Sequence, residues 1–196
     1  MLLALDPGTL SPGLALFSDT GALVAADRVR VDGHADEPDG RRWMHIGHCL
    51  AQWCLRRVPQ NDQLLSVIFE RPQWYSKAKS KGDPNQLAGL TGVAGVMIGV
   101  MMTRWQLSVS SPKPAEWIGQ LPKTCPACRA NKKKCTECKG SAWNTPRGRR
   151  IRSRLTPDEL ALVPDQNDAI DACGLGLFEL KRLTPRSVLS NGRDGR

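Results

Sequence analysis

The sequence predicts an α/β domain built on a mixed five-stranded sheet flanked by helices. Three short apolar runs open the chain at residues 2–6, 14–18 and 23–31, the first ending at Pro7-Gly8. Apolar runs bounded by turn residues indicate strands, and the Asp19-Thr20-Gly21 turn joins the second run to the third. The opening is therefore expected to be an antiparallel meander. Helices and strands alternate after it, which predicts a mixed sheet covered by helices.

The later elements follow from the spacing of apolar residues. Trp43, Ile46 and Leu50 recur at helical spacing in the first predicted helix. The expected helices span residues 41–58, 87–102, 157–162 and 167–183, and the remaining strands span residues 64–70 and 107–110. The apolar segment 87–102 contains four glycines and is shorter than the roughly 20 residues that span a bilayer, which indicates a buried helix.

The length of 196 residues suits one domain, expected at residues 1–183. Residues 184–196 have little to bury and are expected to form a disordered tail. Because the first strand begins at residue 2, no targeting segment is expected, and a cytoplasmic location is predicted.

Positive charge is concentrated in one part of the chain. The net charge is +9, and residues 121–154 contain eleven lysines and arginines but one acid, Glu137. The rest of the sequence is therefore close to neutral, and the local excess favours nucleic-acid contact over a solvated tail. The candidate DNA-binding residues of this stretch are Lys132, Lys133, Lys134, Arg147, Arg149 and Arg150.

Four cysteines in the basic stretch have the spacing of a zinc site. Cys125 and Cys128 form one C-x₂-C pair, and Cys135 and Cys138 form a second, six residues later. Four thiolates at this spacing can close a tetrahedral Zn²⁺ site, with redox cysteines as the alternative. One structural Zn²⁺ is therefore expected in an insertion spanning 121–154.

The other cysteines and a histidine pair have weaker signals. Cys49, Cys54 and Cys173 fall on expected helices and are interpreted as small core residues in a reducing compartment. His45 and His48 are one helical turn apart and could bind a metal, although no cysteine or carboxylate accompanies them in a motif.

Two pairs of acidic residues stand where an active site could form. Asp6 and Glu70 each end an apolar strand, and sites in open α/β sheets lie beyond the carboxyl ends of strands. Asp6 could instead organise the turn before Pro7-Gly8. Asp168 and Asp171 share one face at the start of the last helix. Acids in a first turn also complement the helix dipole, but that does not explain the apolar residues that continue this face.

Four carboxylates in one place repel each other unless a cation is bound. Mg²⁺ prefers such hard oxygen ligands, and two ions about 3.5–4 Å apart can activate water and stabilise the leaving oxygen of a phosphodiester. The sequence thus predicts a metal-dependent phosphodiesterase site that complements the basic stretch.

The acidic motifs, in their order along the chain, resemble those of RuvC-type Holliday-junction resolvases. The matching segments are Leu3-Ala4-Leu5-Asp6-Pro7-Gly8, Gly13-Leu14-Ala15, Ile68-Phe69-Glu70-Arg71-Pro72 and Asn167-Asp168-Ala169-Ile170-Asp171-Ala172. The resemblance implies an RNase H-like fold, a homodimer, and paired nicking of four-way DNA junctions with Mg²⁺ or Mn²⁺. It assigns catalysis and metal binding to Asp6, Glu70, Asp168 and Asp171, and a dimer contact to the glycine-rich helix. The zinc insertion departs from ordinary family members and leaves the preferred DNA open.

The loop after the second acid combines aromatic residues with lysines. Trp74, Tyr75, Lys77, Lys79 and Lys81 suit stacking on unpaired bases and contact with phosphates, and the family uses an aromatic residue here. Packing of Trp74 against its own domain is the alternative. After the fifth strand, Lys113 is the nearest candidate for a lysine that the family places near its site.

Other functions remain open at this point. Asp6-Pro7-Gly8-Thr9 also resembles the phosphate-binding start of sugar kinases and actin-like ATPases, but those proteins need two such domains. A non-catalytic zinc-ribbon adaptor would not need all four acids. Within nucleases, the alternative is an enzyme for forks, flaps or RNA–DNA hybrids.

Overall fold

The computed structural model describes residues 1–30, 38–58, 64–72, 84–118 and 144–183. The strands are β1 (Leu2–Asp6), β2 (Gly13–Phe17), β3 (Leu23–Arg28), β4 (Leu64–Phe69) and β5 (Gln106–Ser110). The helices are α1 (Asp39–Leu55), α2 (Pro84–Met102), α3 (Pro114–Trp117), α4 (Pro146–Arg152), α5 (Pro157–Ala161) and α6 (Asn167–Glu179). Every strand and helix expected from the sequence is present, with small shifts at the ends.

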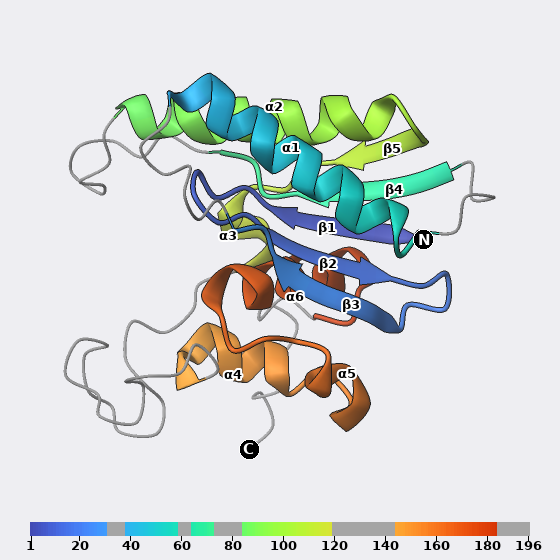
Figure 1. Cartoon of the computed structure of the whole chain (residues 1–196). Coiled ribbons are helices and arrows are strands. Elements are labelled where there is room, and N and C mark those ends of the chain that lie inside the picture. The colour runs from blue at the N-terminus through green and yellow to red at the C-terminus, as the bar shows by residue number, and fades with distance from the viewer. Residues whose placement is uncertain (31–37, 59–63, 73–83, 119–143, 184–196) are drawn as a thin grey trace, which may run out of the picture.

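The five strands form one mixed sheet in the order β3-β2-β1-β4-β5 (Figure 1). β2 pairs antiparallel with β1 and β3, while β4 pairs parallel with β1 and β5. The predicted meander is confirmed, and the parallel half follows from the helical connections between the later strands. This is the mixed five-stranded α/β arrangement with flanking helices that the sequence predicts.

Alternating side chains of the strands form two separate cores. Leu3 and Leu5 of β1 face the core under α1 and α2, whereas Leu2 and Ala4 face the core under α6. Figure 1 shows α1 and α2 on one face of the sheet, and α6 on the other with α4 and α5 beyond it. The sheet is therefore the middle layer, and the ends of its strands remain available for a site.

Helices α3 and α4 were not expected from the sequence. They span four and seven residues, which is too short to show an amphipathic pattern, although each begins with a proline at its first position. Buried Trp117 of α3 and Ile151 of α4 pack these two helices against α6. Gly174 of α6 leaves the space for both side chains, since a Cβ added at Gly174 would lie 2.6 Å from Ile151 and 2.8 Å from Trp117. Residues 144–152 of the basic stretch thus belong to the packed domain.

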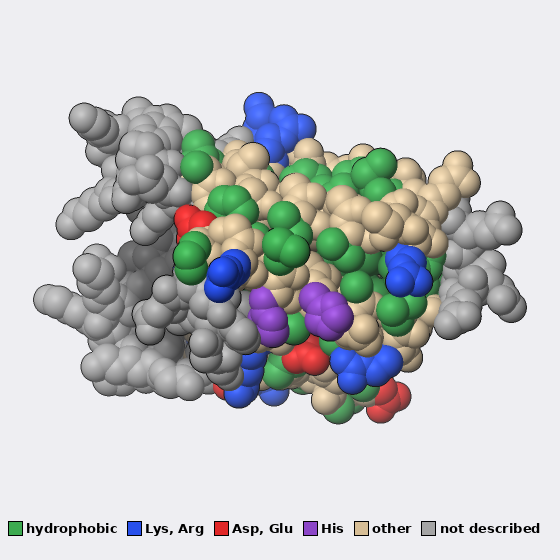
Figure 2. Space-filling model, turned by 45° about the horizontal axis from the view of Figure 1, so that its top comes forward, with side chains coloured by type: hydrophobic (Ala, Val, Ile, Leu, Met, Phe, Trp, Pro, Cys, Tyr) green, Lys and Arg blue, Asp and Glu red, His purple; other side chains and the backbone are tan. Residues whose placement is uncertain are grey.

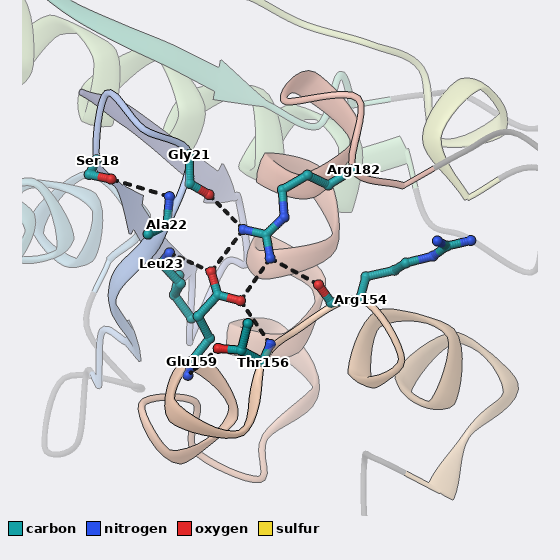
Figure 3. Close-up of polar contacts among 8 residues, drawn as sticks. All are labelled: Ser18, Gly21, Ala22, Leu23, Arg154, Thr156, Glu159 and Arg182. Carbon is teal, nitrogen blue, oxygen red and sulfur yellow. Dashed lines mark hydrogen bonds and ion pairs between the residues drawn. The ribbon is translucent and has the colours of Figure 1, made fainter.

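A hydrogen-bonded ion pair ties α5 to the end of α6 and to the hairpin between β2 and β3 (Figure 3). Glu159 and Arg182 form two parallel hydrogen bonds of 2.8 and 2.7 Å, and Arg182 also donates to the backbone oxygens of Gly21 and Arg154. The Leu23 amide donates to Glu159 at 2.8 Å. We call this group of residues the Glu159–Arg182 cluster. It fixes α5 and the last residues of the domain against the sheet.

The C-terminus of α6 explains how Arg182 reaches this cluster. α6 ends at Glu179 and not at residue 183 as expected, because Lys181 turns into the left-handed region with φ 56°. The Arg182 amide then donates to Leu177 at 2.8 Å and the Lys181 amide to Phe178 at 3.0 Å, a Schellman motif. This reversal carries the Arg182 side chain back toward Glu159.

Several sequence expectations concern residues outside the described ranges. They include the zinc cysteines Cys125, Cys128, Cys135 and Cys138, the loop residues 73–83, Lys132 to Lys134, and the tail 184–196. Within the described ranges, none of the helices combines the length and apolarity needed to cross a membrane. Cys54 and Cys173 are buried, and burial raises the pKa of both thiols, that of Cys54 to about 12, as expected for inert core residues.

Candidate active site

Asp6 and Glu70 lie side by side where two parallel strands end. Leu5 of β1 is in register with Phe69 of β4, and the Glu70 amide donates to the Leu5 carbonyl at 3.3 Å. Asp6 and Glu70 are the next residues along these strands. Sequence reasoning therefore placed the two acids correctly at one edge of the sheet.

Helix α6 brings its first turn to the same edge. Asp6 pairs with Gly13 of β2, and a Cβ added at Gly13 would lie only 1.9 Å from the carbonyl oxygen of Asp168. No other residue allows this approach, which explains the glycine. Asp168 and Asp171 are thus carried next to the end of β1.

The pKa of Asp6 indicates that the other three acids lie close to it. Burial raises the pKa of Asp6 well above its usual value, and the charges of Asp171, Glu70 and Asp168 raise it further in that order. Burial also raises the pKa of Glu70. We name Asp6, Glu70, Asp168 and Asp171 the acidic cluster. Its like charges repel one another in a partly desolvated place, so it is electrostatically unfavourable without a cation.

Among the described residues, three of the four carboxylates have side-chain partners that hold them in place. The Trp117 indole Nε1 donates to Glu70 Oε2 at 2.7 Å, and Ser11 Oγ donates to Asp168 Oδ2 at 2.6 Å. Arg147 Nη2 lies 2.5 Å from Asp171 Oδ2. Sequence reasoning missed Ser11 and Trp117, and it expected Arg147 to contact DNA. Ser11 lies in the loop that follows Asp6, and Trp117 lies in the segment that follows β5. In that second segment, Lys113 was the candidate site residue expected from the sequence.

The donors of the acidic cluster suit a divalent cation in kind. All are hard carboxylate oxygens from three rigid elements, β1, β4 and α6, and one of them already faces the guanidinium of Arg147. Within the described ranges, no three His, Cys, Asp or Glu side chains lie close enough together to hold a metal ion as they stand. The oxygen atoms thus fit Mg²⁺ in chemistry, and in this arrangement three of the carboxylates are oriented toward protein partners.

The structure resembles two solved junction resolvases. T. thermophilus RuvC in complex with a Holliday junction substrate has 13% sequence identity and a TM-score of 0.48, over 90% of each chain. The yeast mitochondrial Holliday junction resolvase Ydc2 has 13% identity and a TM-score of 0.49, over 92% of this chain and 79% of that one. No family model and no curated protein matches the sequence. A proposed function must therefore rest on the side chains of this chain.

The basic candidates for DNA binding that the structure describes belong to two short helices, α3 and α4. Arg147, Arg149 and Arg150 lie on α4, and the Arg150 guanidinium donates to the Ile118 carbonyl at 3.1 Å. Lys113 is exposed at the start of α3, the helix that ends with Trp117. Both helices contact α6, and Arg147 of α4 reaches Asp171, so the described arginines of α4 lie on a helix that adjoins the candidate active site.

Proposed function

We propose that this protein is a metal-dependent endonuclease that resolves four-way DNA junctions by paired nicking. The observation that carries the proposal is the convergence of Asp6, Glu70, Asp168 and Asp171 on one sheet edge, where three of them raise the pKa of Asp6. The ordered motifs that resemble RuvC-type resolvases, the basic stretch of the sequence and the contact of its Arg147 with Asp171 support the same function.

The roles of the residues follow from their positions. Asp6, Glu70, Asp168 and Asp171 would hold Mg²⁺ or Mn²⁺, which when bound supplies a Lewis acid and an activated water for phosphodiester hydrolysis. Trp117 fixes the orientation of Glu70, and Ser11 fixes that of Asp168. The arginines of α4 and Lys113 would attract the phosphate backbone toward the carboxylates.

Paired nicking requires two active sites, and the exposed face of α2 suits a homodimer. This face consists of uncharged residues, and they are Ala88, Thr91, Gly95, Gly99 and Met102. Figure 2 shows hydrophobic side chains spread over the side of the molecule that α1 and α2 cover, with few charged ones among them. Met44 and Met102 are 72% and 65% exposed. An apolar helical surface of this kind is typical of an interface between subunits.

The dimer can be tested without disturbing the monomer. A Cβ added at Gly95 or Gly99 would meet no atom within 4 Å, so Gly95→Lys should leave the fold intact and separate the subunits. Leu162→Lys, at an exposed position after α5 on the other face of the sheet, is the control. Light scattering of the wild type and both variants decides the matter. A monomeric wild type would remove the dimer from the proposal.

The cysteine pairs are proposed to bind one structural Zn²⁺ through Cys125, Cys128, Cys135 and Cys138. Elemental analysis should find about one zinc per chain, and serine variants should lose it. A zinc-free protein with unchanged folding and DNA affinity would contradict the proposal.

The decisive experiment is cleavage of a mobile four-way junction with Mg²⁺, beside linear duplex, fork, flap and RNA–DNA hybrid. Symmetric nicks at the junction and little cleavage of the others are expected. Preferential cleavage of forks, flaps or hybrids would support a nuclease but contradict the four-way junction as its substrate. DNA binding without cleavage of any substrate would indicate the non-catalytic alternative.

A further inference from the structure

Arg147 is in direct contact with one carboxylate of the acidic cluster. Its Nη2 atom lies 2.5 Å from Asp171 Oδ2, and the two side chains are 33% and 10% exposed. Its charge also lowers the pKa of both Asp6 and Glu70. The positive charge of the guanidinium therefore interacts favourably with three of the four carboxylates, as the charge of a bound metal ion would.

The backbone that carries Arg147 is held firmly beside the acidic cluster. Thr145 caps α4 by accepting a hydrogen bond from the Gly148 amide at 2.9 Å. Ile151, one turn further along α4, is buried in the core under α6 beside Gly174. Moving the helix away would expose this contact, so we expect the Arg147 side chain, and not α4, to change position.

We propose that Arg147 is the resident counter-ion of the acidic cluster and competes with the metal for Asp171. This inference rests on the proposed function, because it takes the acidic cluster as the metal site. An arginine does not lose its proton in proteins, so its positive charge must move aside when a divalent cation binds Asp171. The ion pair then offsets carboxylate repulsion in the metal-free protein and weakens metal binding in proportion to its stability.

The test compares four proteins by Mn²⁺ titration, with the free ion followed by electron paramagnetic resonance. The variants are Arg147→Gln, which removes the charge, Arg147→Lys, which keeps it, and Arg152→Gln. Arg152 is an exposed residue of the same helix and serves as the matched control. Relative to Arg152→Gln, the Kd for Mn²⁺ should fall about fivefold in Arg147→Gln, as expected for a pair of partly exposed ions. Arg147→Lys should remain close to the wild type.

Two further measurements locate the effect. In an Asp171→Asn background, Arg147→Gln should change the Kd much less, since the ion pair is already gone and only the weaker effect of the charge on Asp6 and Glu70 remains. With a chelator present, Arg147→Gln should melt at a lower temperature than Arg152→Gln, and saturating Mn²⁺ should remove the difference. Equal Mn²⁺ affinity in Arg147→Gln and Arg152→Gln would overturn the inference.

The outcome is separable from that of the proposed function. A protein that shows the Arg147 effect on Mn²⁺ binding but cuts no junction would keep this inference and reject the nuclease. If the protein cuts junctions but Arg147→Gln and Arg152→Gln bind Mn²⁺ equally well, the nuclease is supported and this inference is rejected. Absence of any Mn²⁺ binding at the acidic cluster would reject both.

Discussion

Two regions of this molecule bury carboxylates, and the surroundings shift the carboxylate pKa in opposite directions. In the Glu159–Arg182 cluster, Arg182 and the Leu23 and Thr156 amides all donate to one carboxylate. The hydrogen bonds from Arg182 are the main cause that lowers the pKa of Glu159 to about 2. In the acidic cluster, burial and three neighbouring acids raise the pKa of Asp6.

The difference separates a carboxylate that stabilises the fold from the carboxylates that we propose to bind metal. Glu159 is a stable anion because its donors outweigh its burial, so it contributes to the free energy of unfolding. The acidic cluster opposes folding, and a fold keeps such an arrangement where it serves binding or catalysis. The comparison makes separate predictions for the two regions.

The largest effect is expected from Asp6→Asn. Loss of a carboxylate from the proposed metal site should reduce Mg²⁺-dependent junction cleavage by more than about a thousandfold. Since the change also removes a repelled charge, the metal-free protein should melt at the same or a higher temperature. Single-turnover cleavage, junction binding and thermal melting with a chelator measure the three quantities. Near wild-type turnover would remove Asp6 from the site.

Glu159→Gln should have the opposite profile. It leaves Arg182 without its anion, which should lower the free energy of unfolding by about 3 kcal/mol. Cleavage at temperatures where the variant is folded should be unchanged. Denaturant unfolding at pH 7 measures the loss, and a variant as stable as the wild type would show that Glu159 is as dispensable as a surface acid.

The pH dependence of this loss has a definite sign. Because the folded pKa of Glu159, about 2, lies below its usual value of 4.5, the carboxylate stabilises the fold above pH 4.5. That contribution decreases as the pH falls from about 4.5 and is lost as the pH passes through about 2. The stability difference between wild type and Glu159→Gln should therefore shrink over this range.

Trp117→Phe sharpens the comparison, because it alters one hydrogen bond of the acidic cluster. Phenylalanine keeps a ring against Gly174 but cannot donate to Glu70. Cleavage should fall about tenfold, as is typical when the partner of a metal ligand is removed. Trp105→Phe, a change of the same kind in the core under α1 and α2, is the control and should alter stability only. Equal cleavage by both variants would assign Trp117 to packing alone.

The smallest effect is expected from Lys181→Gly at the edge of the Glu159–Arg182 cluster. Lys181 has φ 56°, which a glycine adopts without strain, so the change should raise the free energy of unfolding by about 1 kcal/mol. Thermal and denaturant unfolding measure the gain. A loss of stability would indicate that the lysine side chain stabilises the fold by more than the left-handed backbone conformation destabilises it.

The sequence by itself determined the sheet, its order of elements and the acids that end its strands. Apolar runs of residues 2–6 and 64–69 stop at Asp6 and Glu70, and parallel pairing brings such strand ends together whatever the details of packing. The spacing of Asp168 and Asp171 likewise places both at the start of α6. These features depend on local periodicity and chain order, which the sequence carries directly.

Only the tertiary structure decided which groups serve those acids. Trp117, Ser11 and Arg147 are 47 residues from Glu70, 157 from Asp168 and 24 from Asp171, and no periodic signal links them. Helices α3 and α4 are too short to be stable alone and exist because Trp117 and Ile151 pack on α6. Contacts between residues so far apart in the chain are selected by the shape and charge of the folded core, which no local pattern specifies.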